Sequence, residues 1–575
     1  GWVNTTLAAF APLLFWPGIT GEFMKYLPLT LIATLTASLL MALIFIPVLG
    51  SVFGKPRVLS EKEQNNAILA DKGELLTLTG FTGLYVKALH NAVKKPWSVL
   101  LLTSVVAASG VTLFATSHLG VEFFPDVEPT GINVKVRSYG DFSIYEQDQI
   151  MSTIEQKILP LSDEIDTLYL KTGDASGELV GNIRINLRDW QDRRSADEII
   201  ADIQQRTKDL PGVEIELKKD QAGPPVGKDL QIEIGSRFPY LLQATADKIH
   251  HALQEKSYFV NIEDDGEKPG VEWQFKIDRA DAARYGADAT LLGSSVQFLT
   301  NGLMLGTYRP DDVDDELDIR VRYPEKERSL SKLAALRIQT TAGQIPVSHF
   351  VTLSPSPKQS SINKVDGRIV MTVSADIAPG YNLSLILPEL EKEFASLELD
   401  PRVTLKLRGE NEEQQEAASF LKNAFIVALT IMALILVLQF NSFYQAFLIL
   451  SAVLFSTSGV FIGLFISQSA FGIVMSGIGV IALAGIVVNN NIVLIDTYNV
   501  LKEQGVNTHD AILRTGAQRI RPVLMTTVTT ILGLMPMVLK VNLDFFERTI
   551  EFGAPSTQWW AQLATAIAGG LTFAT

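Results

Sequence analysis

The sequence has no cysteine, and its charged residues are confined to part of the chain. The absence of cysteine among 575 residues excludes disulfide bonds and thiolate metal sites. The six histidines are scattered, and no Ser/His/Asp constellation of a hydrolase is present. Charge is missing altogether from residues 423–495, a stretch long enough for about three membrane-spanning helices of ~20 residues each.

Further uncharged stretches at 26–54, 96–121 and 522–539 are additional candidates for membrane spans. Because 19% of all residues are nevertheless charged, the charge must be concentrated elsewhere. We therefore predict a polytopic α-helical membrane protein with one large extramembrane α+β domain at about 122–420. The net charge of −14, with no basic patch interleaved with aromatic residues, argues against nucleic acid as a partner.

The distribution of basic residues predicts the orientation of this protein. Lysine and arginine are frequent in the connector 55–95 and in the loop 499–521. Short basic loops stay on the cytoplasmic side of a membrane. Counting spans from these loops places the 122–420 domain on the opposite side, which is the periplasm of a Gram-negative cell. We therefore expect a multi-pass protein of the bacterial inner membrane.

The extramembrane domain has the pattern of a repeat. Within 130–218, alternating strands and helical spacings follow the order βαββαβ, which is the ferredoxin-like arrangement. The same order returns after residue 226 around a long insertion, and two such units side by side would leave a cleft. The expected division is membrane helices at 1–54, a cytoplasmic connector at 55–95, a membrane helix at 96–121, a first unit at 122–225, a second unit at 226–278 and 361–410, an inserted α/β subdomain at 279–360, and membrane helices at 420–575.

The segment GIVVNNNIVLID, residues 485–496, places three consecutive asparagines in the middle of an apolar helix predicted at about 472–503. A buried amide in hydrocarbon is costly unless it finds a hydrogen-bond partner. Asn489 and Asp496 are seven residues apart and therefore share a face of the helix. Two interpretations stay open from the residues alone: an interhelical hydrogen-bond clamp, or the lining of a proton path.

Four segments resemble the resistance-nodulation-division (RND) efflux pumps, in the branch that exports hydrophobic and amphiphilic compounds. These segments are TTLAAFAPLLFWPGITGEF, LRDWQDRRSADEI, GIVVNNNIVLID and RIRPVLMTTVTTILG. The resemblance covers the whole chain in order and corresponds to the C-terminal half of such a pump. Both ends of the sequence lie in or beside apolar segments, so we expect a piece of a longer protein with its first and last membrane helices truncated.

The resemblance implies a proton-driven transporter that works as a homotrimer, surrounded by membrane lipid and without a cofactor. The two ferredoxin-like units would be porter subdomains that bind amphiphilic small molecules. The insertion at 279–360 would be half of a docking subdomain. It would meet a periplasmic adaptor protein and an outer-membrane channel, and the three proteins together would form a conduit across the envelope.

The resemblance also assigns a proton relay to the asparagine helix. Many such pumps carry a lysine at the position of Asn489, followed by an asparagine that matches Asn490. That lysine pairs with two aspartates on the fourth helix, and an arginine and a threonine that match Arg519 and Thr526 complete the relay. Asn489 departs from the pattern, because an amide can hydrogen-bond but carries no charge. We therefore expect either a single titrating carboxylate on the fourth helix or a larger role for Arg519.

Each relay candidate also has a purely structural interpretation. Arg519 and Arg521 could be cations at the cytoplasmic edge of the membrane, with Pro522 opening a helix. The hydroxyl groups of Thr526 and Thr530, one turn apart, could bond back to carbonyls of their own helix.

The strands at 168–188 are the expected substrate region. In multidrug members they supply several phenylalanines to a deep pocket, and a glycine-containing switch loop divides it. Here Tyr169 is the one aromatic residue near the expected place, and Lys171 and Arg184 stand where apolar side chains would be expected. Facing the cleft, they would favour anionic amphiphiles; otherwise they face water. The candidate residues of the pocket and switch loop are Tyr169, Lys171, Gly173, Gly177, Gly181 and Arg184.

Export of heavy metals is the nearest alternative function. It calls for methionine clusters or acid pairs, and the three methionines of the extramembrane domain, Met151, Met304 and Met371, are far apart in sequence. The adjacent His250 and His251 point about 100° apart on a helix and make a poor chelate. We therefore predict no metal site.

Two further alternatives come from other classes of protein. Ferredoxin-like units also build membrane-anchored nucleotide cyclases, but no Walker-type or GGDEF-like stretch is present, so we do not expect an enzyme. The missing lysine leaves open a non-pumping structural subunit of a hetero-oligomeric RND complex.

Overall fold

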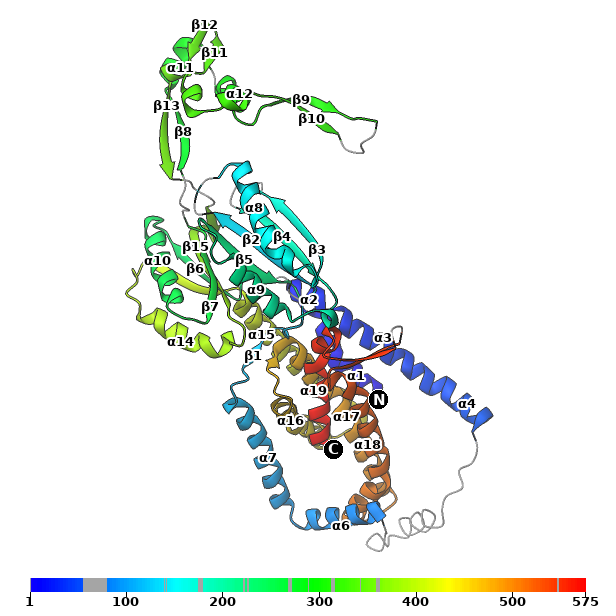
Figure 1. Ribbon diagram of the computed structural model, residues 1–575. Coiled ribbons are helices and arrows are strands. Elements are labelled where there is room, and N and C mark those ends of the chain that lie inside the picture. Colours follow the sequence, from blue (N-terminus) through cyan, green and yellow to red (C-terminus); the bar gives the residue numbers. More distant parts are fainter. Residues whose placement is uncertain are drawn as a thin grey trace.

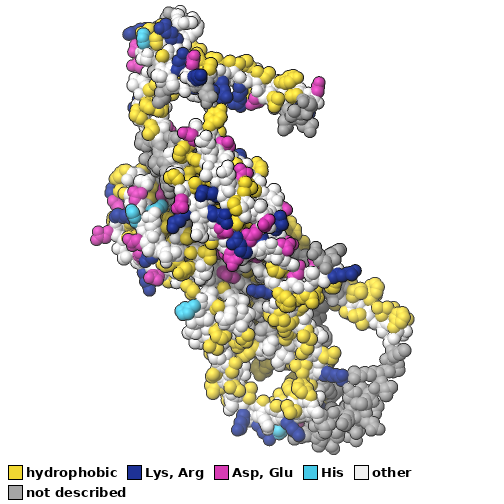
Figure 2. All heavy atoms as spheres, viewed as in Figure 1, with side chains coloured by type: hydrophobic (Ala, Val, Ile, Leu, Met, Phe, Trp, Pro, Cys, Tyr) yellow, Lys and Arg dark blue, Asp and Glu magenta, His cyan; other side chains and the backbone are white. Residues whose placement is uncertain are grey.

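The computed structural model shows a helical block, two α/β units above it and an extended distal part (Figure 1). Lysine and arginine gather at the end of the helical block where α6 lies, and the α/β units carry charge of both signs (Figure 2). The structure describes residues 2–54, 80–138, 140, 142–173, 179–220, 223–224, 227–266, 271–287, 289–311, 316–341, 343–357, 362–545 and 548–575.

Six helical stretches among the described residues are long and apolar enough to cross a membrane. The first, Gly18–Phe53, is built from α2 (Gly18–Met24), α3 (Tyr26–Leu40), a π-helical turn (Met41–Phe45) and α4 (Ile46–Phe53). The others are α7 (Pro96–Thr116), α15 (Glu410–Phe440), α16 (Phe443–Ile466), α17 (Ile473–Glu503) and α18 (Thr508–Val538). The block also contains α1 (Trp2–Phe10), a 3-10 turn (Ala11–Phe15), α6 (Gly80–Lys94) and α19 (Pro555–Ala574).

The expectation that Pro522 opens a helix is wrong, because α18 begins at Thr508 and continues through both Pro522 and Pro536. The first part of α18 is amphipathic, and Leu513 is buried against Val86 of α6. This burial stabilises helix on the N-terminal side of Pro522 and offsets the hydrogen bond that the proline removes.

The first α/β unit is a four-stranded antiparallel sheet with two helices on one face. Alternation places Ile132, Val134 and Val136 of β2 in the core against the helices, and the residues between them point to the opposite face. The strand order is β3-β4-β2-β5. Its elements are β2 (Gly131–Ser138), α8 (Ile144–Ile158), β3 (Ile165–Thr172), β4 (Leu179–Leu187), α9 (Ala196–Thr207) and β5 (Val213–Lys219).

The second unit is a five-stranded sheet covered by α10 and α14. Its strand order is β14-β15-β6-β16, and β7 also pairs with β15. Its elements are β6 (Leu230–Ser236), α10 (Tyr240–Gln254), β7 (Phe259–Asp264), β14 (Asn363–Val365), β15 (Arg368–Ile377), α14 (Leu383–Ser396) and β16 (Val403–Arg408).

The strand predicted at the end of the range 226–278 does not join this sheet. β8 (Val271–Ile277) pairs instead with β13 (Val351–Pro357) in a separate two-stranded ribbon. The edge of β15 that faces away from β6 is already paired with β7 and β14, so the sheet has no place beside it for β8. The second unit therefore ends before residue 271, and β8 leads into the insertion.

The insertion forms the distal part of the molecule and has a small core around Leu292, Ile338 and Phe350. A hairpin of β9 and β10 extends from it as an arm (Figure 1). Its elements are α11 (Arg279–Tyr285), α12 (Ala289–Leu299), β9 (Leu303–Tyr308), β10 (Leu317–Val321), α13 (Leu330–Ala334), β11 (Arg337–Thr340) and β12 (Gly343–Pro346).

Two short strand pairs complete the fold near the top of the helical block. β1 (Val121–Glu122) pairs in parallel with β17 (Phe471–Gly472), which directly precedes α17. β18 (Val541–Asp544) and β19 (Thr549–Phe552) form a hairpin between α18 and α19.

Candidate functional site

The asparagine helix lies inside the helical block. α17 packs against α1, α16, α18 and α19. Gly485 permits the close approach of α1, because an added Cβ would lie 3.3 Å from the Cα of Thr6 and from the Cβ of Ala9. The side-chain oxygen of Asn489 is buried and has no hydrogen-bond partner among the described residues. Because buried polar atoms are nearly always paired, this oxygen marks a place where a further donor is expected.

Arg519 joins α18 to α17. Its Nε donates a hydrogen bond of 2.6 Å to the hydroxyl of Thr497, which in turn donates to the Val493 carbonyl at 2.9 Å. Thr497 follows Asp496, whose side chain is exposed. Thr497 lies about 12 Å further along α17 than Asn489, at 1.5 Å per residue, so Arg519 contacts a different part of this helix.

Thr526 is exposed, and its hydroxyl bonds back to the Val523 carbonyl at 2.8 Å. The Thr530 hydroxyl likewise donates to the Thr526 carbonyl at 2.8 Å. α17 and α18 are antiparallel and meet where Arg519 contacts Thr497. Thr526 is seven residues after Arg519 and Asn490 is seven residues before Thr497, so Thr526 and Asn490 lie at a similar depth. The relay assignment of Asn489, Asn490, Arg519 and Thr526 stays a prediction.

The candidate pocket residues lie on the first unit. Tyr169 and Arg184 are neighbours across β3 and β4, and both are exposed, as is Lys171. Arg184 forms an ion pair with Asp220 at 3.0 Å. These side chains therefore belong to a polar, exposed sheet face.

The glycines of the switch loop are only partly described. Gly173 has a left-handed φ of +73°, which favours glycine. At Gly181 an added Cβ would lie 2.6 Å from the Lys171 carbonyl and from the Met151 side chain, so close packing requires glycine there. Gly177 lies outside the described residues.

The polar face of the first unit meets the second unit in a buried group of ions. Lys228 Nζ lies 3.4 Å from Glu216 Oε1 and 3.2 Å from Glu263 Oε1. Arg137 also contacts both carboxylates, with 3.7 Å to Glu216. Glu216 is 5% exposed and Lys228 is 7% exposed, so these charges are removed from water.

A second pair of contacts extends this group. Lys218 Nζ lies 3.8 Å from Asp376 Oδ1, and Asn261 Nδ2 donates to Asp376 Oδ2 at 3.0 Å. We call the whole set the ionic seam; it comprises Arg137, Glu216, Lys218, Lys228, Asn261, Glu263 and Asp376. It joins β2 and β5 of the first unit to β7 and β15 of the second.

Burial in the ionic seam disfavours the charged form of Lys228. Desolvation is the largest effect on Lys228 and lowers its pKa, although Glu216 and Asp376 oppose that shift. Both carboxylate oxygens of Glu216 lack a hydrogen bond within the described part of the chain, so its ion pairs with Lys228 and Arg137 compensate its charge. No three His, Asp or Glu side chains in the described residues are already spaced to hold a metal ion.

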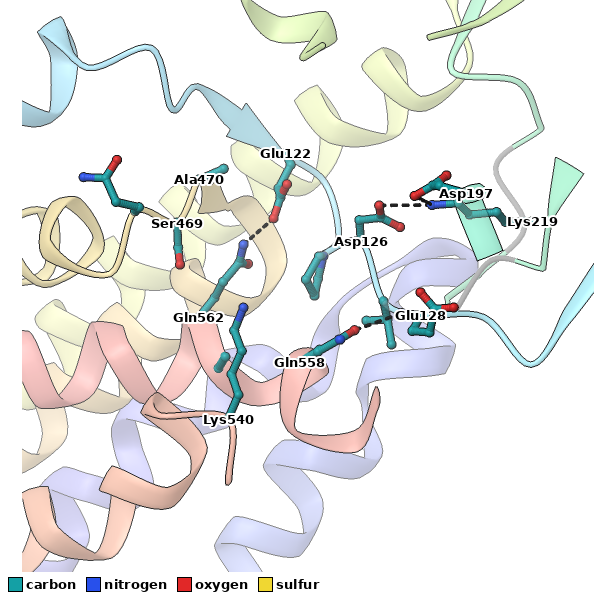
Figure 3. A pocket seen from close by; sticks show the side chains of 14 residues that line it. Glu122, Asp126, Glu128, Asp197, Lys219, Ser469, Ala470, Lys540, Gln558 and Gln562 are labelled. Carbon is teal, nitrogen blue, oxygen red and sulfur yellow. Dashed lines mark hydrogen bonds and ion pairs between the residues drawn. The ribbon is translucent and has the colours of Figure 1, made fainter. Parts of the chain in front are cut away.

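A polar cavity of about 350 Å³ lies between the helical block and the first unit (Figure 3). Acidic side chains reach it from the segment after α7 and from α9, and amides reach it from α19. Neither this cavity nor the seam was predicted from the sequence. The outward charges of VEIELKK in β5 were the one available signal for the seam.

Long apolar helices that enclose polar residues, below a paired α/β domain, are the architecture of a polytopic membrane protein. Residues 2–574 match the AcrB/AcrD/AcrF family, and the chain belongs to this family of RND pumps. The family expected from the sequence motifs is thereby confirmed.

The chain is similar to three curated relatives over nearly its whole length. It is 26% identical over 596 residues to the cation efflux system protein CzcA of Alcaligenes sp. (strain CT14), covering 99% of this chain and 53% of the relative. The same values hold for the cobalt-zinc-cadmium resistance protein CzcA of Cupriavidus metallidurans. The swarming motility protein SwrC of Bacillus subtilis (strain 168) is 24% identical over 553 residues, covering 93% and 50%. The chain spans about half the length of these relatives.

Two crystal structures of a heavy metal efflux pump have the same fold. The superpositions have TM-scores of 0.75 and 0.73 at 19% sequence identity. Each match covers 100% of this chain and 55% of the chain in the crystal structure. The names of these pumps and of the two CzcA proteins do not describe the amphiphile branch that the motifs suggested.

Proposed function

We propose that this chain is the C-terminal half of a proton-driven RND exporter of the bacterial inner membrane, and that its substrate is a metal cation rather than an amphiphile. Family membership and the long apolar helices support the transporter, and the names of the two CzcA relatives support the substrate class. The two α/β units would be ferredoxin-like porter subdomains, and the insertion would belong to a docking subdomain. A homotrimer with a periplasmic adaptor and an outer-membrane channel is part of the proposal.

The ionic seam is the observation that carries the cation proposal. Glu216 of the first unit and Glu263 of the second both contact the Lys228 ammonium, and Asp376 lies beside Lys218 in the same seam. Carboxylates ligate Zn²⁺ and harder divalent cations. If the units separate during transport, a cation can replace the ammonium of Lys228 between these acids. An amphiphile would instead need an aromatic or apolar lining, and Tyr169 alone does not supply one.

The test measures metal and bile-salt accumulation in cells that lack their own exporters and express the complete transporter. We expect cellular Zn²⁺, Co²⁺ or Cd²⁺ to fall, and Glu216→Gln to abolish most of that fall. Glu214→Gln is the matched control, because Glu214 lies two residues earlier on β5. Bile-salt export without metal export would favour the amphiphile alternative. Export of neither would favour the non-pumping subunit.

The relay proposal assigns Arg519 a role in proton movement beyond its contact with Thr497. We expect Arg519→Gln to reduce proton-coupled transport about 100-fold, the scale of losing a proton-transfer group. Thr497→Val removes the same hydrogen bond but keeps the cation, so we expect it to have a much smaller effect. The measurement is substrate uptake into proteoliposomes under an imposed pH gradient. Equal, small losses in both variants would show that Arg519 only clamps the two helices.

A further inference from the structure

The segment 120–128, which we call the tether, connects α7 to the first α/β unit. On one side β1 of the tether pairs with β17, and the Phe471 N–H donates to the Gly120 carbonyl at 3.2 Å, directly before α17 begins. On the other side Glu128 accepts a hydrogen bond of 2.6 Å from Arg193 of the first unit. The tether thus touches both the asparagine helix and the extramembrane domain.

Glu122 extends from the tether toward α19 (Figure 3). Its carboxylate accepts a hydrogen bond from Nε2 of Gln562. Gln562 is only 6% exposed, and its Oε1 has no hydrogen-bond partner among the described residues. A Cβ at Gly472 would lie 1.9 Å from this oxygen, so the amide is enclosed against the start of α17. A buried amide with one satisfied end and one unsatisfied end lines the cavity.

Several charged groups surround Glu122. Burial is the largest effect and raises its pKa to about 7, the hydrogen bond from Gln562 lowers it, Asp126 raises it and Lys540 lowers it. On the side of α15, the Phe123 backbone hydrogen-bonds the carboxylate of Glu410. The remaining charged groups that line the cavity are Glu128, Asp197 and Lys219.

Lys219 does not neutralise Glu122. Its ammonium forms ion pairs with Asp197 at 2.9 Å and with Asp126 at 3.4 Å. Glu128 is likewise paired with Arg193. Lys540 is therefore the one cation of the described cavity lining that is not engaged by another carboxylate in a recorded ion pair. This charge balance lets Glu122 gain or lose a proton near neutral pH.

Each protonation state of Glu122 has a matching orientation of Gln562. The carboxylate accepts from Nε2, as the structure shows. The protonated acid carries a hydroxyl donor, which can bond to Oε1 once the amide rotates. After that rotation Oε1 of Gln562 would have a hydrogen-bond partner, and its Nε2 would point in another direction. A change in the protonation of Glu122 can therefore change the orientation of the Gln562 side chain on α19.

Polar groups continue inward from this pair. Ser476 of α17 is fully buried, and its hydroxyl has no partner among the described residues. Gly472, which directly precedes α17, and Gly479 of α17 contact α19 at Gln562 and Ala566. Ser476 lies between these two contacts at helical spacing and so shares their face. Deeper along α17, the next orphaned side-chain oxygen is that of Asn489.

We propose that Glu122 and Gln562 form a proton-binding site, coupled to transport, at the extracytoplasmic end of the helical block. A proton from bulk water reaches the Glu122 carboxylate through the cavity. The Glu122 carboxylate takes up a proton from the water of this cavity and returns it there on release, and the Gln562 amide changes its hydrogen bond with each step. This inference rests on the proposed proton-driven transport, because without that transport the protonation of Glu122 would not be coupled to the movement of a substrate.

The first test is a direct titration of Glu122 in the complete transporter. Infrared difference spectra between about pH 6 and about pH 8 bracket the pKa of about 7. We expect a protonated-carboxyl band that disappears in Glu122→Gln, because glutamine keeps the size and polarity of the side chain but cannot titrate. An unchanged band in this variant would overturn the proposal, whether or not the protein transports anything.

The second test is the pH dependence of transport at a constant pH gradient. Above pH 7 the protonated fraction of Glu122 falls about tenfold per pH unit, so we expect the wild-type rate to fall with it. Glu122→Gln should remove this dependence. Asp126→Asn, on the exposed side of the cavity, should keep the dependence with its midpoint moved slightly down, because Asp126 raises the pKa.

Gln562→Leu should move the midpoint of transport up, because the hydrogen bond from Gln562 lowers the pKa. A purely structural clamp would give Glu122→Gln a wild-type profile, since the amide can still hydrogen-bond Gln562. That result would overturn the proposal. A wild-type protein that transports no substrate would instead refute the proposed function, and the infrared titration would still decide whether Glu122 binds a proton.

Discussion

Replacing Lys228 by methionine is expected to destabilise the extramembrane region by about 3–5 kcal/mol, the usual cost of removing one partner from a buried ion pair. The variant leaves Glu216 and Glu263 facing each other with only Arg137 to compensate them. Methionine fills a similar volume, so the lost charge rather than a cavity causes the effect. The measurement is the apparent melting temperature of the purified transporter, which should fall by about 10 °C.

The control is Lys218→Met on the same seam. Lys218 is 26% exposed, and its one recorded ion pair in the described chain, with Asp376, is long at 3.8 Å. Water screens such a pair, so we expect a change within about 1 kcal/mol. Adding Glu216→Gln to Lys228→Met should restore part of the stability, because it removes an uncompensated charge. Equal effects of the two lysine variants would show that burial of the seam does not matter.

The same variant separates the structural role of the seam from its proposed role in transport. Without the Lys228 ammonium, Glu216 and Glu263 keep only Arg137 as a cationic partner and should bind Zn²⁺ more tightly. Added Zn²⁺ should therefore raise the melting temperature of Lys228→Met more than that of the wild type, by mass action on the folded state. If the ionic seam has no role in cation binding, Zn²⁺ should change the melting temperature of the wild type and of Lys228→Met equally.

The membrane helices were the most predictable part of the fold. The asparagine helix was expected at about 472–503 and spans Ile473–Glu503, because a long uncharged run can satisfy its backbone in a membrane only as a helix. The strand at Val271–Ile277 was also predicted, but its pairing partner was not. Alternation of side chains defines a strand and says nothing about which edge it meets.

The functional groups were harder to predict than the fold. The sequence motifs pointed to Arg519 but not to Thr497, which it contacts, because a threonine in a helix usually bonds to its own backbone. The ionic seam brings Arg137 and Glu216 to Glu263 and Lys228 from distant parts of the sequence. Glu122 stood directly after a predicted span, where a charged residue ordinarily marks the end of a helix.

The branch of the family was a less secure expectation than the family itself, and the reason is physical. The motifs that carried the resemblance lie largely in membrane helices and in their contacts, where every member meets the same packing and coupling constraints. Under the proposed function, substrate choice depends on side chains that meet between the two α/β units, such as Glu216 and Glu263. Those side chains lie outside the motifs, so colinear motifs identify the transporter but not its cargo.

Replacing Gly569 by leucine is expected to separate α16 from α19 and to prevent the helical block from packing. A Cβ at Gly569 would lie 2.6 Å from the Gly459 carbonyl oxygen and 3.0 Å from the Gly463 Cα. Both are backbone atoms, so the helices themselves must move apart. Small residues permit such close contact between membrane helices. Alanine should already cost about 1–3 kcal/mol by overpacking, and leucine more.

Gly533→Ala in α18 is the matched control, because an added Cβ there meets no atom within 4 Å. Alanine also favours a helix over glycine by about 1 kcal/mol, so this variant should be neutral or slightly stabilised. The measurement is the yield of monodisperse transporter in detergent together with its melting temperature. Equal behaviour of Gly569→Ala and Gly533→Ala would contradict the close packing of α16 and α19. Because α19 also carries Gln562, Gly569→Ala should in addition shift the titration of Glu122, whereas Gly533→Ala should leave it unchanged.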